Sequence, residues 1–271
     1  MSVTPLKIMT WNIRFASNTA PNEWNVRRGP MNTLIEAENP DILGTQEGIR
    51  TPITQLEHIA TDLGSTYSWL GVGRDAGGTA GEHMAIFYRN TRLSVVTSGN
   101  FWMSDTPDTP GSNWAAPNNN AFIRMCTWAQ FRDRRTGHRF YVYNTHLDNS
   151  NNAARLLSAD LIHTRIAAHN PYRPVIVMGD FNQPAERDNA VYQRLLGNGK
   201  LHDTWFSSGT RGTEYKSHMD FQTPVPVDPA QNLDRIDWIF ATKEFISNTS
   251  YQNISAPGGQ YPSDHIPVIS W

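Results

Sequence analysis

The chain has 271 residues, of which 38% are hydrophobic, 11% aromatic and 18% charged, and this composition is typical of a globular protein with a sizeable core. Its formal net charge of −2 argues against a protein that grips long duplex nucleic acid by charge alone. The single cysteine, Cys126, excludes a disulfide within the chain and a cysteine-based zinc site, and we expect it to be a small buried hydrophobe.

Targeting and membrane signals are absent from the sequence. No apolar run approaches the ~20 residues that a spanning helix needs, so we expect no membrane anchor. Residues 1–15 contain neither a long apolar stretch nor a small-residue cleavage site, so we expect no signal peptide and a cytoplasmic location, unless the chain has been trimmed. No obligate protein partner is evident.

Strand-like segments rich in β-branched and aromatic residues recur along the whole chain. In order, they are LKIMTWNI (6–13), DILGTQE (41–47), MAIFYR (84–89), LSVVTSG (93–99), TWAQFRD (127–133), RFYVYNTHL (139–147), PVIVMGD (174–180), RIDWIFA (235–241) and HIPVIS (265–270).

Three helices are expected between these strands. The first runs from near Arg27 to Glu38. The second lies in 51–64, with Thr51 as its N-cap and Pro52 at its first position. The third lies in 151–171 and has one apolar side made of Ala153, Leu157, Leu161 and Ile162. Strands mixed with helices over the whole length predict an α/β fold.

The stretch 101–124 differs from the rest because it is rich in Pro, Asn, Ser and Asp. We expect a long irregular loop, and loops of this length in compact domains are usually functional or disordered. Trp102 and Trp114 lie in it, and Arg124 ends it. Because indole faces stack on apolar ligand faces, we predict that the two tryptophans bind substrate. We predict that Arg124 also binds substrate, as a contact to phosphate.

Polar residues that end or interrupt apolar strands form the clearest functional signal. They are Asn12, Glu47, His146, Asp148, Asp180, Asn182, Asp237, Asp264 and His265. Such groups are costly beside a core unless they are paired or bind a metal. A single case, such as Asp180 and Asn182 in VIVMGDFNQ, could be an ordinary turn. The repetition instead predicts that the strand ends converge on one site.

The residue types indicate the chemistry of that site. Carboxylates and amides are hard oxygen donors that suit Mg²⁺ or Mn²⁺, and no His-x-x-x-His pair supports zinc. A carboxylate can orient and deprotonate a water for attack on phosphorus, and an imidazolium can neutralise the charge that develops. A second carboxylate bonded to that imidazole would keep it charged.

The ordered set TWNI, TQE, NTHLD, GDFN, RIDWIF and SDHIPV resembles the endonuclease/exonuclease/phosphatase superfamily of DNase I-like proteins. Each motif is weak alone, but all six occur in the family's order between residues 10 and 268. The finer pattern resembles a branch of small microbial and fungal members. The resemblance implies one domain over 1–271, built as a four-layer α/β sandwich of two packed mixed sheets flanked by helices.

The resemblance also implies metal-site roles. Glu47 of the TQE motif would bind the catalytic Mg²⁺ or Mn²⁺. Asn12 lies beside it as a ligand or a supporting group, and Asp264 would be a ligand of the first or a second metal.

Catalytic roles carry over in the same way. Asp180 would position or deprotonate the attacking water, and Asn182 would touch the scissile phosphate. His265 would contact the phosphate and be held by Asp237. His146 would be a second phosphate contact or a proton donor.

Some assignments have strong structural alternatives. Glu82 would support His146, although an ordinary surface carboxylate is a competing reading. Asp148 would bind substrate, although capping of the following helix explains it equally well. For His218, in the loop segment YKSHMDF, the sequence supports a site residue and an ordinary loop residue equally.

The substrate expected from these features is a phosphate ester, preferably a diester, of a small molecule or glycan, because the chain is not basic and carries no evident nucleic-acid-binding module. The alternative is a nuclease, with arginines contacting phosphates: Arg74, Arg124, Arg132, Arg134, Arg135 and Arg155. A binding protein that has lost catalysis is less expected, because none of the motif residues is missing.

Overall fold

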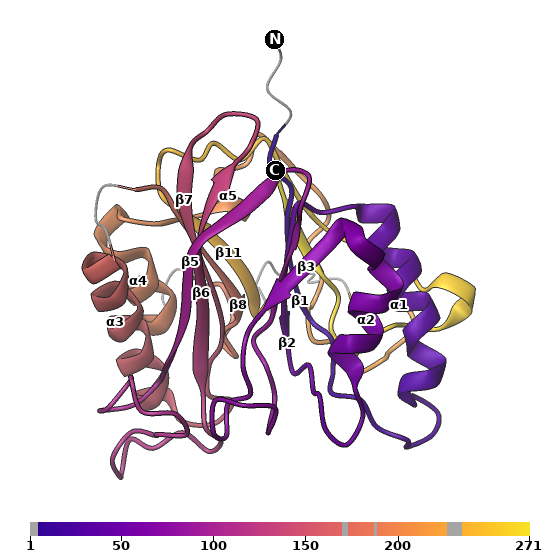
Figure 1. Ribbon diagram of the computed structural model, residues 1–271, viewed down its shortest axis with the longest axis horizontal. Helices are drawn as coiled ribbons and strands as arrows, with labels where there is room; N and C mark the ends of the chain where they lie inside the picture. Colours follow the sequence, from indigo (N-terminus) through magenta and orange to yellow (C-terminus); the bar gives the residue numbers. More distant parts are fainter. Residues whose placement is uncertain (1–4, 170–172, 187–188, 227–234) are drawn as a thin grey trace.

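The computed structural model describes residues 5–169, 173–186, 189–226 and 235–271, which form two mixed β-sheets packed face to face (Figure 1). One seven-stranded sheet has the order β10-β12-β13-β1-β2-β4-β3. Its strands are β1 (Ile8–Asn12), β2 (Ile42–Gln46), β3 (Tyr67–Leu70), β4 (Ile86–Arg89), β10 (Thr210–Arg211), β12 (Thr249–Gln252) and β13 (Val268–Ser270). β1 runs parallel to β2 and antiparallel to β13.

The other, six-stranded sheet has the order β5-β6-β7-β8-β11-β9. Its strands are β5 (Leu93–Trp102), β6 (Met125–Asp133), β7 (Arg139–His146), β8 (Val175–Asp180), β9 (His202–Asp203) and β11 (Asp237–Ala241). β7 and β8 are parallel, and β11 returns antiparallel to β8. The carboxyl ends of β7 and β8 and the start of β11 therefore lie side by side at the same end of the strands of this sheet.

Helices cover the outer face of each sheet. They are α1 (Trp24–Glu38), α2 (Gln55–Leu63), α3 (Asn152–His169), α4 (Ala190–Leu196) and α5 (Thr204–Ser207), with short 3-10 turns η1 (Gly64–Thr66), η2 (Gly197–Gly199) and η3 (Pro257–Gly259). Figure 1 shows α1 and α2 on one side of the sheet pair and α3 and α4 on the other. The result is the four-layer α/β sandwich that the sequence resemblance implies.

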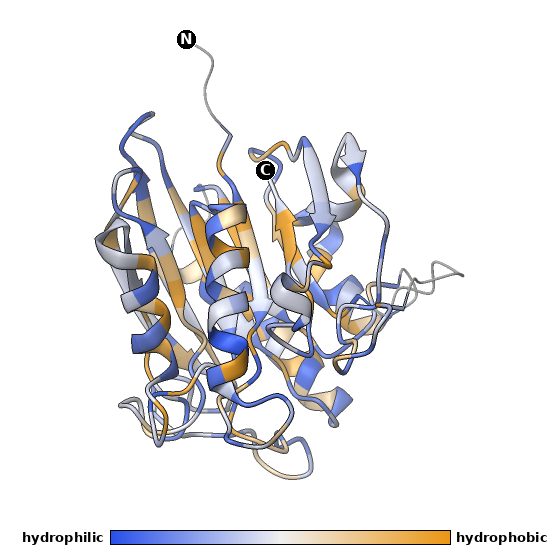
Figure 2. Cartoon of the chain, turned by 90° about the vertical axis from the view of Figure 1, so that its right-hand side faces the viewer, coloured by the Kyte–Doolittle hydropathy of each residue, from blue (hydrophilic) through white to orange (hydrophobic). Residues whose placement is uncertain are grey.

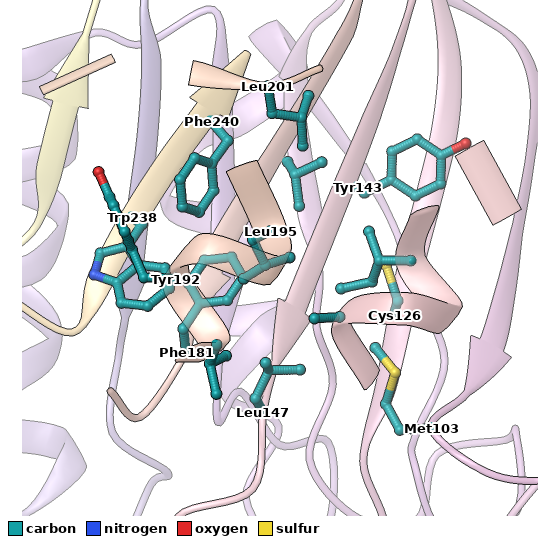
Figure 3. Close-up of a cluster of buried hydrophobic side chains, with 14 of the residues drawn as sticks. Met103, Cys126, Tyr143, Leu147, Phe181, Tyr192, Leu195, Leu201, Trp238 and Phe240 are labelled. Atoms are coloured by element: carbon teal, nitrogen blue, oxygen red, sulfur yellow. The ribbon is translucent and has the colours of Figure 1, made fainter. Parts of the chain in front are cut away.

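Apolar side chains fill the three spaces between these layers. Met9, Leu34 and Leu56 belong to the cluster between α1, α2 and the seven-stranded sheet, whereas Ile42 and Met178 pack between the two sheets. Figure 2 shows hydrophobic colour concentrated along the strands and hydrophilic colour on most loops. The core beneath α3 and α4 is aromatic and includes buried Cys126, as expected (Figure 3).

All nine expected strands are present, with ends that differ by a few residues. The loop after β5 is irregular over 103–124, as predicted. Six elements were not predicted from the sequence: β3, β9, β10, β12, α4 and α5. These elements are short, and β3 is only half-buried, so its apolar pattern is weak.

Two helix details were wrong. The second helix begins at Gln55, with Thr54 rather than Thr51 as its N-cap residue. Its start is tied to the preceding loops by the Gln55 side chain, whose Oε1 accepts from Ala16 and Ile49.

The buried side of the third helix is shifted from the one expected, although Ile162 is buried and Leu157 and Leu161 pack against the core, as predicted. Ala154, Ser158 and Ile162 face the core, whereas Ala153 is exposed and Leu157 is only half-buried. No helix in the described part of the chain is both long and apolar enough to cross a bilayer.

Candidate active site

The ends of four strands meet where the two sheets pack. His146 of β7 pairs in register with Asp180 of β8, which pairs with Asp237 of β11. Asn12 ends β1 in the facing sheet, and its amide nitrogen donates to Asp180 Oδ2 at 3.0 Å. The predicted convergence of polar strand ends is therefore present, and a hydrogen bond across the two sheets joins them.

A cavity of about 400 Å³ opens at this point. Most of its lining is charged or polar and consists of Arg14, Phe15, Glu47, Arg74, Glu82, Phe122, Arg124, His146, Asn149, Asp180, Asn182, His218, Ile236, Asp264 and His265. This volume is in the range of small-molecule sites.

Asp180 is the buried carboxylate at the centre of the site. Its Oδ2 lies 3.5 Å from His146 Nε2 and 3.8 Å from His265 Nε2. Burial, reinforced by the charge of Asp237, raises the pKa of Asp180 to about 7, although His265 and Asn12 oppose the shift. A carboxylate whose pKa is near neutral is suited to accept a proton from water.

The chain turns immediately after Asp180 rather than staying extended. Asn182 has a φ of 51°, and its backbone N–H donates to Asp180 Oδ1 at 2.9 Å. Because of this turn, both residues face the site. Asp180 and Asn182 therefore form a turn and also belong to the site. Phe181 points the other way and stacks on Trp238 in the core, with ring centroids 4.6 Å apart (Figure 3).

Gly179 is required where β8 approaches β7. Its φ is +152°, and a Cβ there would lie 2.0 Å from the backbone oxygen of Thr145. Any side chain would push the two strands apart just before Asp180.

His265 and Asp237 form a buried pair. His265 Nδ1 lies 2.9 Å from Asp237 Oδ2. Burial alone would lower the pKa of His265, but Asp237, Asp180 and Asp264 outweigh it and raise that pKa to about 10. The imidazole is therefore positively charged at neutral pH, and its Nε2 faces Asp180.

His146 has the opposite charge state. Burial, together with the positive charges of Arg124 and Arg74, lowers its pKa well below 6.5. Asn182 donates its amide N–H to Nε2 of the neutral ring at 3.0 Å, which leaves the proton on Nδ1. That Nδ1 lies 3.9 Å from Glu82 Oε2.

Glu82 is in turn held by Arg74, whose Nη1 donates to Glu82 Oε2 at 2.5 Å. Burial raises the pKa of Glu82, and Arg74 opposes the shift. Glu82 therefore lies within the site rather than on an open surface.

Glu47, Asp264 and Asn12 offer the oxygen atoms expected for a hard cation. Glu47 lines the cavity and has a φ of 63°, a conformation that non-glycine residues rarely adopt and that often marks a functional position. Asp264 Oδ2 lies 3.6 Å from Arg14 Nη1 and 3.9 Å from His218 Nε2, both beyond hydrogen-bond distance. Both carboxylates can therefore accept a metal ion.

Asn12 is oriented to hold carboxylates rather than to bind the ion itself. The backbone N–H of Arg14 donates to Asn12 Oδ1 at 3.0 Å, which fixes which side of the amide is oxygen. The amide nitrogen then donates to Glu47 Oε1 at 2.9 Å as well as to Asp180. Of the two roles that the resemblance left open, this geometry favours the supporting one.

A second set of atoms also has metal-site spacing. Ligand atoms of Asp180, Asp237 and His265 lie within 4.8 Å of one another. The 2.9 Å contact between His265 and Asp237 engages one atom of each, so we regard that pair as a hydrogen-bonded dyad and Glu47 as the better metal ligand.

The two tryptophans predicted to bind substrate do not line the cavity. Trp102 is 4% exposed and donates its indole N–H to the backbone oxygen of Arg74. Trp114 is 9% exposed and donates to Ser158 Oγ. Neither lines the cavity, so that prediction was wrong: tertiary packing buries the rings of a loop whose sequence is polar.

Asp148 is also not a substrate contact. It is fully buried and accepts from the backbone N–H groups of Ala121, Ser150 and Asn151. Asn151 caps α3, because its side chain accepts from the N–H groups of Ala153 and Ala154. Asp148 therefore fixes the turn before the helix.

Several cavity residues were not predicted. Arg14, Phe15, Phe122 and Asn149 were missed, whereas Arg124 lines the cavity as predicted and undecided His218 reaches it. Phe122 is a single aromatic residue after three asparagines, which is the signal that could have identified it. Arg132, Arg134 and Arg135 lie on the exposed β6–β7 hairpin and do not line the cavity, and neither does buried Arg155.

The chain belongs to the Endonuclease/Exonuclease/phosphatase family, whose model matches residues 9–265. Enzymes of this family are typically dependent on divalent metals. The match includes every strand end that contributes to the site.

Individual relatives agree with this assignment. Uncharacterized protein L388 of Acanthamoeba polyphaga mimivirus is 31% identical over 65% of this chain and 64% of its own length, so the match spans less than two thirds of that protein. The endonuclease/exonuclease/phosphatase of Bacteroides vulgatus is 30% identical, with a TM-score of 0.87 over 98% of this chain and 97% of that one. A mannosyl-6-phosphatase of Bacteroides thetaiotaomicron is 29% identical, with a TM-score of 0.87 over 98% and 99%. Family and neighbours together support a phosphoesterase.

Proposed function

We propose that this single-domain protein is a metal-dependent phosphatase that hydrolyses a phosphate monoester on a sugar or glycan. The observation that carries the proposal is the charge arrangement of the small cavity. A buried carboxylate with a pKa near 7, a charged imidazole and the guanidinium groups of Arg14, Arg74 and Arg124 line about 400 Å³.

Three cationic side chains beside His265 suit a dianionic phosphate better than a singly charged diester. The similarity to a mannosyl-6-phosphatase over nearly the whole of both chains supports the same choice. The proposal therefore replaces the diester that the sequence favoured. A nuclease is less well supported, because the exposed arginine hairpin lies outside the cavity.

The proposed reaction begins with a water held by Asp180. Asp180 takes one proton as the water oxygen bonds to phosphorus, and the sugar oxygen leaves with the electron pair of the broken P–O bond. The sugar oxygen takes up a proton from solvent, and Asp180 then returns its own proton to solvent. The imidazolium of His265, fixed by Asp237, stabilises the negative charge that develops on the phosphate oxygens. Asn182 keeps the neutral ring of His146 in place beside them.

Glu47 and Asp264 would hold the divalent ion, with Asn12 orienting Glu47. The ion, when bound, supplies positive charge to the phosphate oxygens. Hard-oxygen ligands favour Mg²⁺ or Mn²⁺.

The test is phosphate release from mannose 6-phosphate with Mg²⁺ or Mn²⁺, beside hydrolysis of bis(p-nitrophenyl) phosphate and nicking of plasmid DNA. The proposal expects the sugar phosphate to have the highest kcat/KM. Faster cleavage of the diester would restore the sequence-based preference, and rapid plasmid nicking would establish the nuclease alternative.

A further inference from the structure

Phe122 is an exposed aromatic residue inside the candidate active site. Its side chain is 52% exposed, and it lines a cavity whose other lining residues are mostly charged or polar. Isolated surface hydrophobes are common and need no explanation. This one differs because a site for a highly charged group has no use for an apolar ring unless the ligand has an apolar face.

The ring is held in place on several sides. The guanidinium carbons of Arg74 and Arg124 lie 5.4 and 5.7 Å from its centroid. The preceding residue, Ala121, donates its backbone N–H to buried Asp148 at 2.6 Å. Asn151 donates to the backbone oxygens of Pro117 and Asn119 in the same loop. A ring fixed before binding costs little conformational entropy when a ligand arrives.

A buried cation beside the ring has unused hydrogen-bonding capacity. Arg124 is 3% exposed, its Nε–H has no hydrogen-bond partner among the described residues, and Nη2 meets Asn149 Oδ1 only at 3.4 Å. Buried polar groups are normally paired, so the guanidinium of Arg124 is incompletely satisfied within the protein and can donate to a ligand in the cavity that it lines. Burial and the nearby charge of Arg74 also lower the pKa of Arg124, as expected for a cation that lacks a full counter-charge.

We propose that Phe122 and Arg124 form a sugar-binding subsite, in which the apolar face of a sugar ring stacks on Phe122 while Arg124 donates to an oxygen of the same sugar phosphate. The inference rests on the proposed function and adds to it the residue that selects the sugar. Asp148 acts as a positioning residue for this subsite, since it fixes the backbone beside Phe122.

The experiment measures binding by calorimetry in buffer containing Mg²⁺, in an Asp180→Asn background that prevents turnover. The ligands are mannose 6-phosphate and inorganic phosphate, which share the phosphate but not the ring. Phe122→Ala is expected to weaken binding of the sugar phosphate about tenfold and binding of inorganic phosphate less than about twofold. Phe122→Tyr keeps the stacking face and is expected to stay near the starting affinity.

Phe206→Ala is the matched control. Phe206 is also an exposed phenylalanine, 40% exposed, with Arg211 and Arg235 each 5.7 Å from its ring, but it does not line the cavity. It lies on α5, at the end of the sandwich near the chain termini in Figure 1. Neither ligand should respond to this substitution.

Three results would overturn the subsite. The first is that Phe122→Ala weakens binding of both ligands equally, and the second is that it weakens binding of neither. The third is that the Asp180→Asn protein without a further substitution binds the sugar phosphate no more tightly than inorganic phosphate. The proposed function fails separately: ring-dependent binding with no hydrolysis by the wild-type protein would leave the subsite standing without the phosphatase. Hydrolysis by the wild-type protein, together with an unchanged KM in Phe122→Ala, would support the phosphatase and refute the subsite.

Discussion

Arg27 should be the structural residue on which the site depends most strongly. It is fully buried at the start of α1, and burial lowers its pKa to about 10, which leaves it charged. Its guanidinium donates to five backbone oxygens in segments that border site residues: those of Ile13, Arg14, Phe15, Asn22 and Pro262. These bonds join the end of β1 to the segment just before Asp264 and His265.

Replacing Arg27 by Met would remove all five donors and keep most of the apolar stem. The bonds to Ile13 and Pro262 are buried, and each carbonyl left unpaired costs about 1–3 kcal/mol. We expect the free energy of unfolding to fall by about 4 kcal/mol. Because the segment that carries His265 loosens, kcat/KM should also fall by about tenfold or more.

Arg28→Met provides the control, since Arg28 makes a partly exposed pair with Asp62 at 2.6 Å and such pairs contribute about 1 kcal/mol or less. Urea unfolding measures both variants. An Arg27→Met protein that loses less than about 1 kcal/mol, or no more than Arg28→Met, would refute the reasoning.

Two further predictions concern stability. Gly179→Ala should lower the free energy of unfolding by about 3 kcal/mol or more, because its Cβ would meet the Thr145 oxygen. Gly29→Ala is the control: its Cβ would have no atom within 4 Å, so the free energy of unfolding should change by about 1 kcal/mol at most. Equal effects of the two substitutions would contradict the close approach of β8 to β7. Burial lowers the pKa of His83 from 6.5 to about 4, so the unfolded chain binds a proton between these pH values that the folded chain does not. Stability should therefore fall as the pH drops from 6.5 to 4, by up to about 3 kcal/mol from this residue, and His83→Gln should flatten that dependence in urea unfolding at a series of pH values.

The strand ends could be predicted because their physics is local. A carboxylate such as Asp180 or Asp237 inside an apolar strand is costly, so its presence in the sequence signals a site. The order of the motifs along the chain then indicated the family, and with it the sandwich of two mixed sheets. The GDFN motif also contains two residues that serve packing. Gly179 allows β8 to approach β7, and Phe181 anchors the turn by stacking on Trp238.

The loop after β5 was harder to predict because its contacts are long-range. Trp102 at the end of β5 and Trp114 in the loop belong to a stretch rich in Pro, Asn, Ser and Asp. Their indole N–H groups nevertheless donate to Arg74 and Ser158, which lie far away in the sequence. Phe122 has the opposite fate and stays exposed in the cavity. No local pattern distinguishes these outcomes, because they depend on which chain segments pack against the loop.

The most direct test of the account is the Mg²⁺-dependent rate of phosphate release from mannose 6-phosphate by the wild-type protein and by Asp180→Asn. Asparagine matches the shape of aspartate but cannot accept the proton from water. The account predicts a rate lower by about 10²–10⁴ in a variant that unfolds at the same temperature as the wild type. A folded variant that keeps a rate within about tenfold of the wild type would contradict the role of Asp180 at the centre of the site.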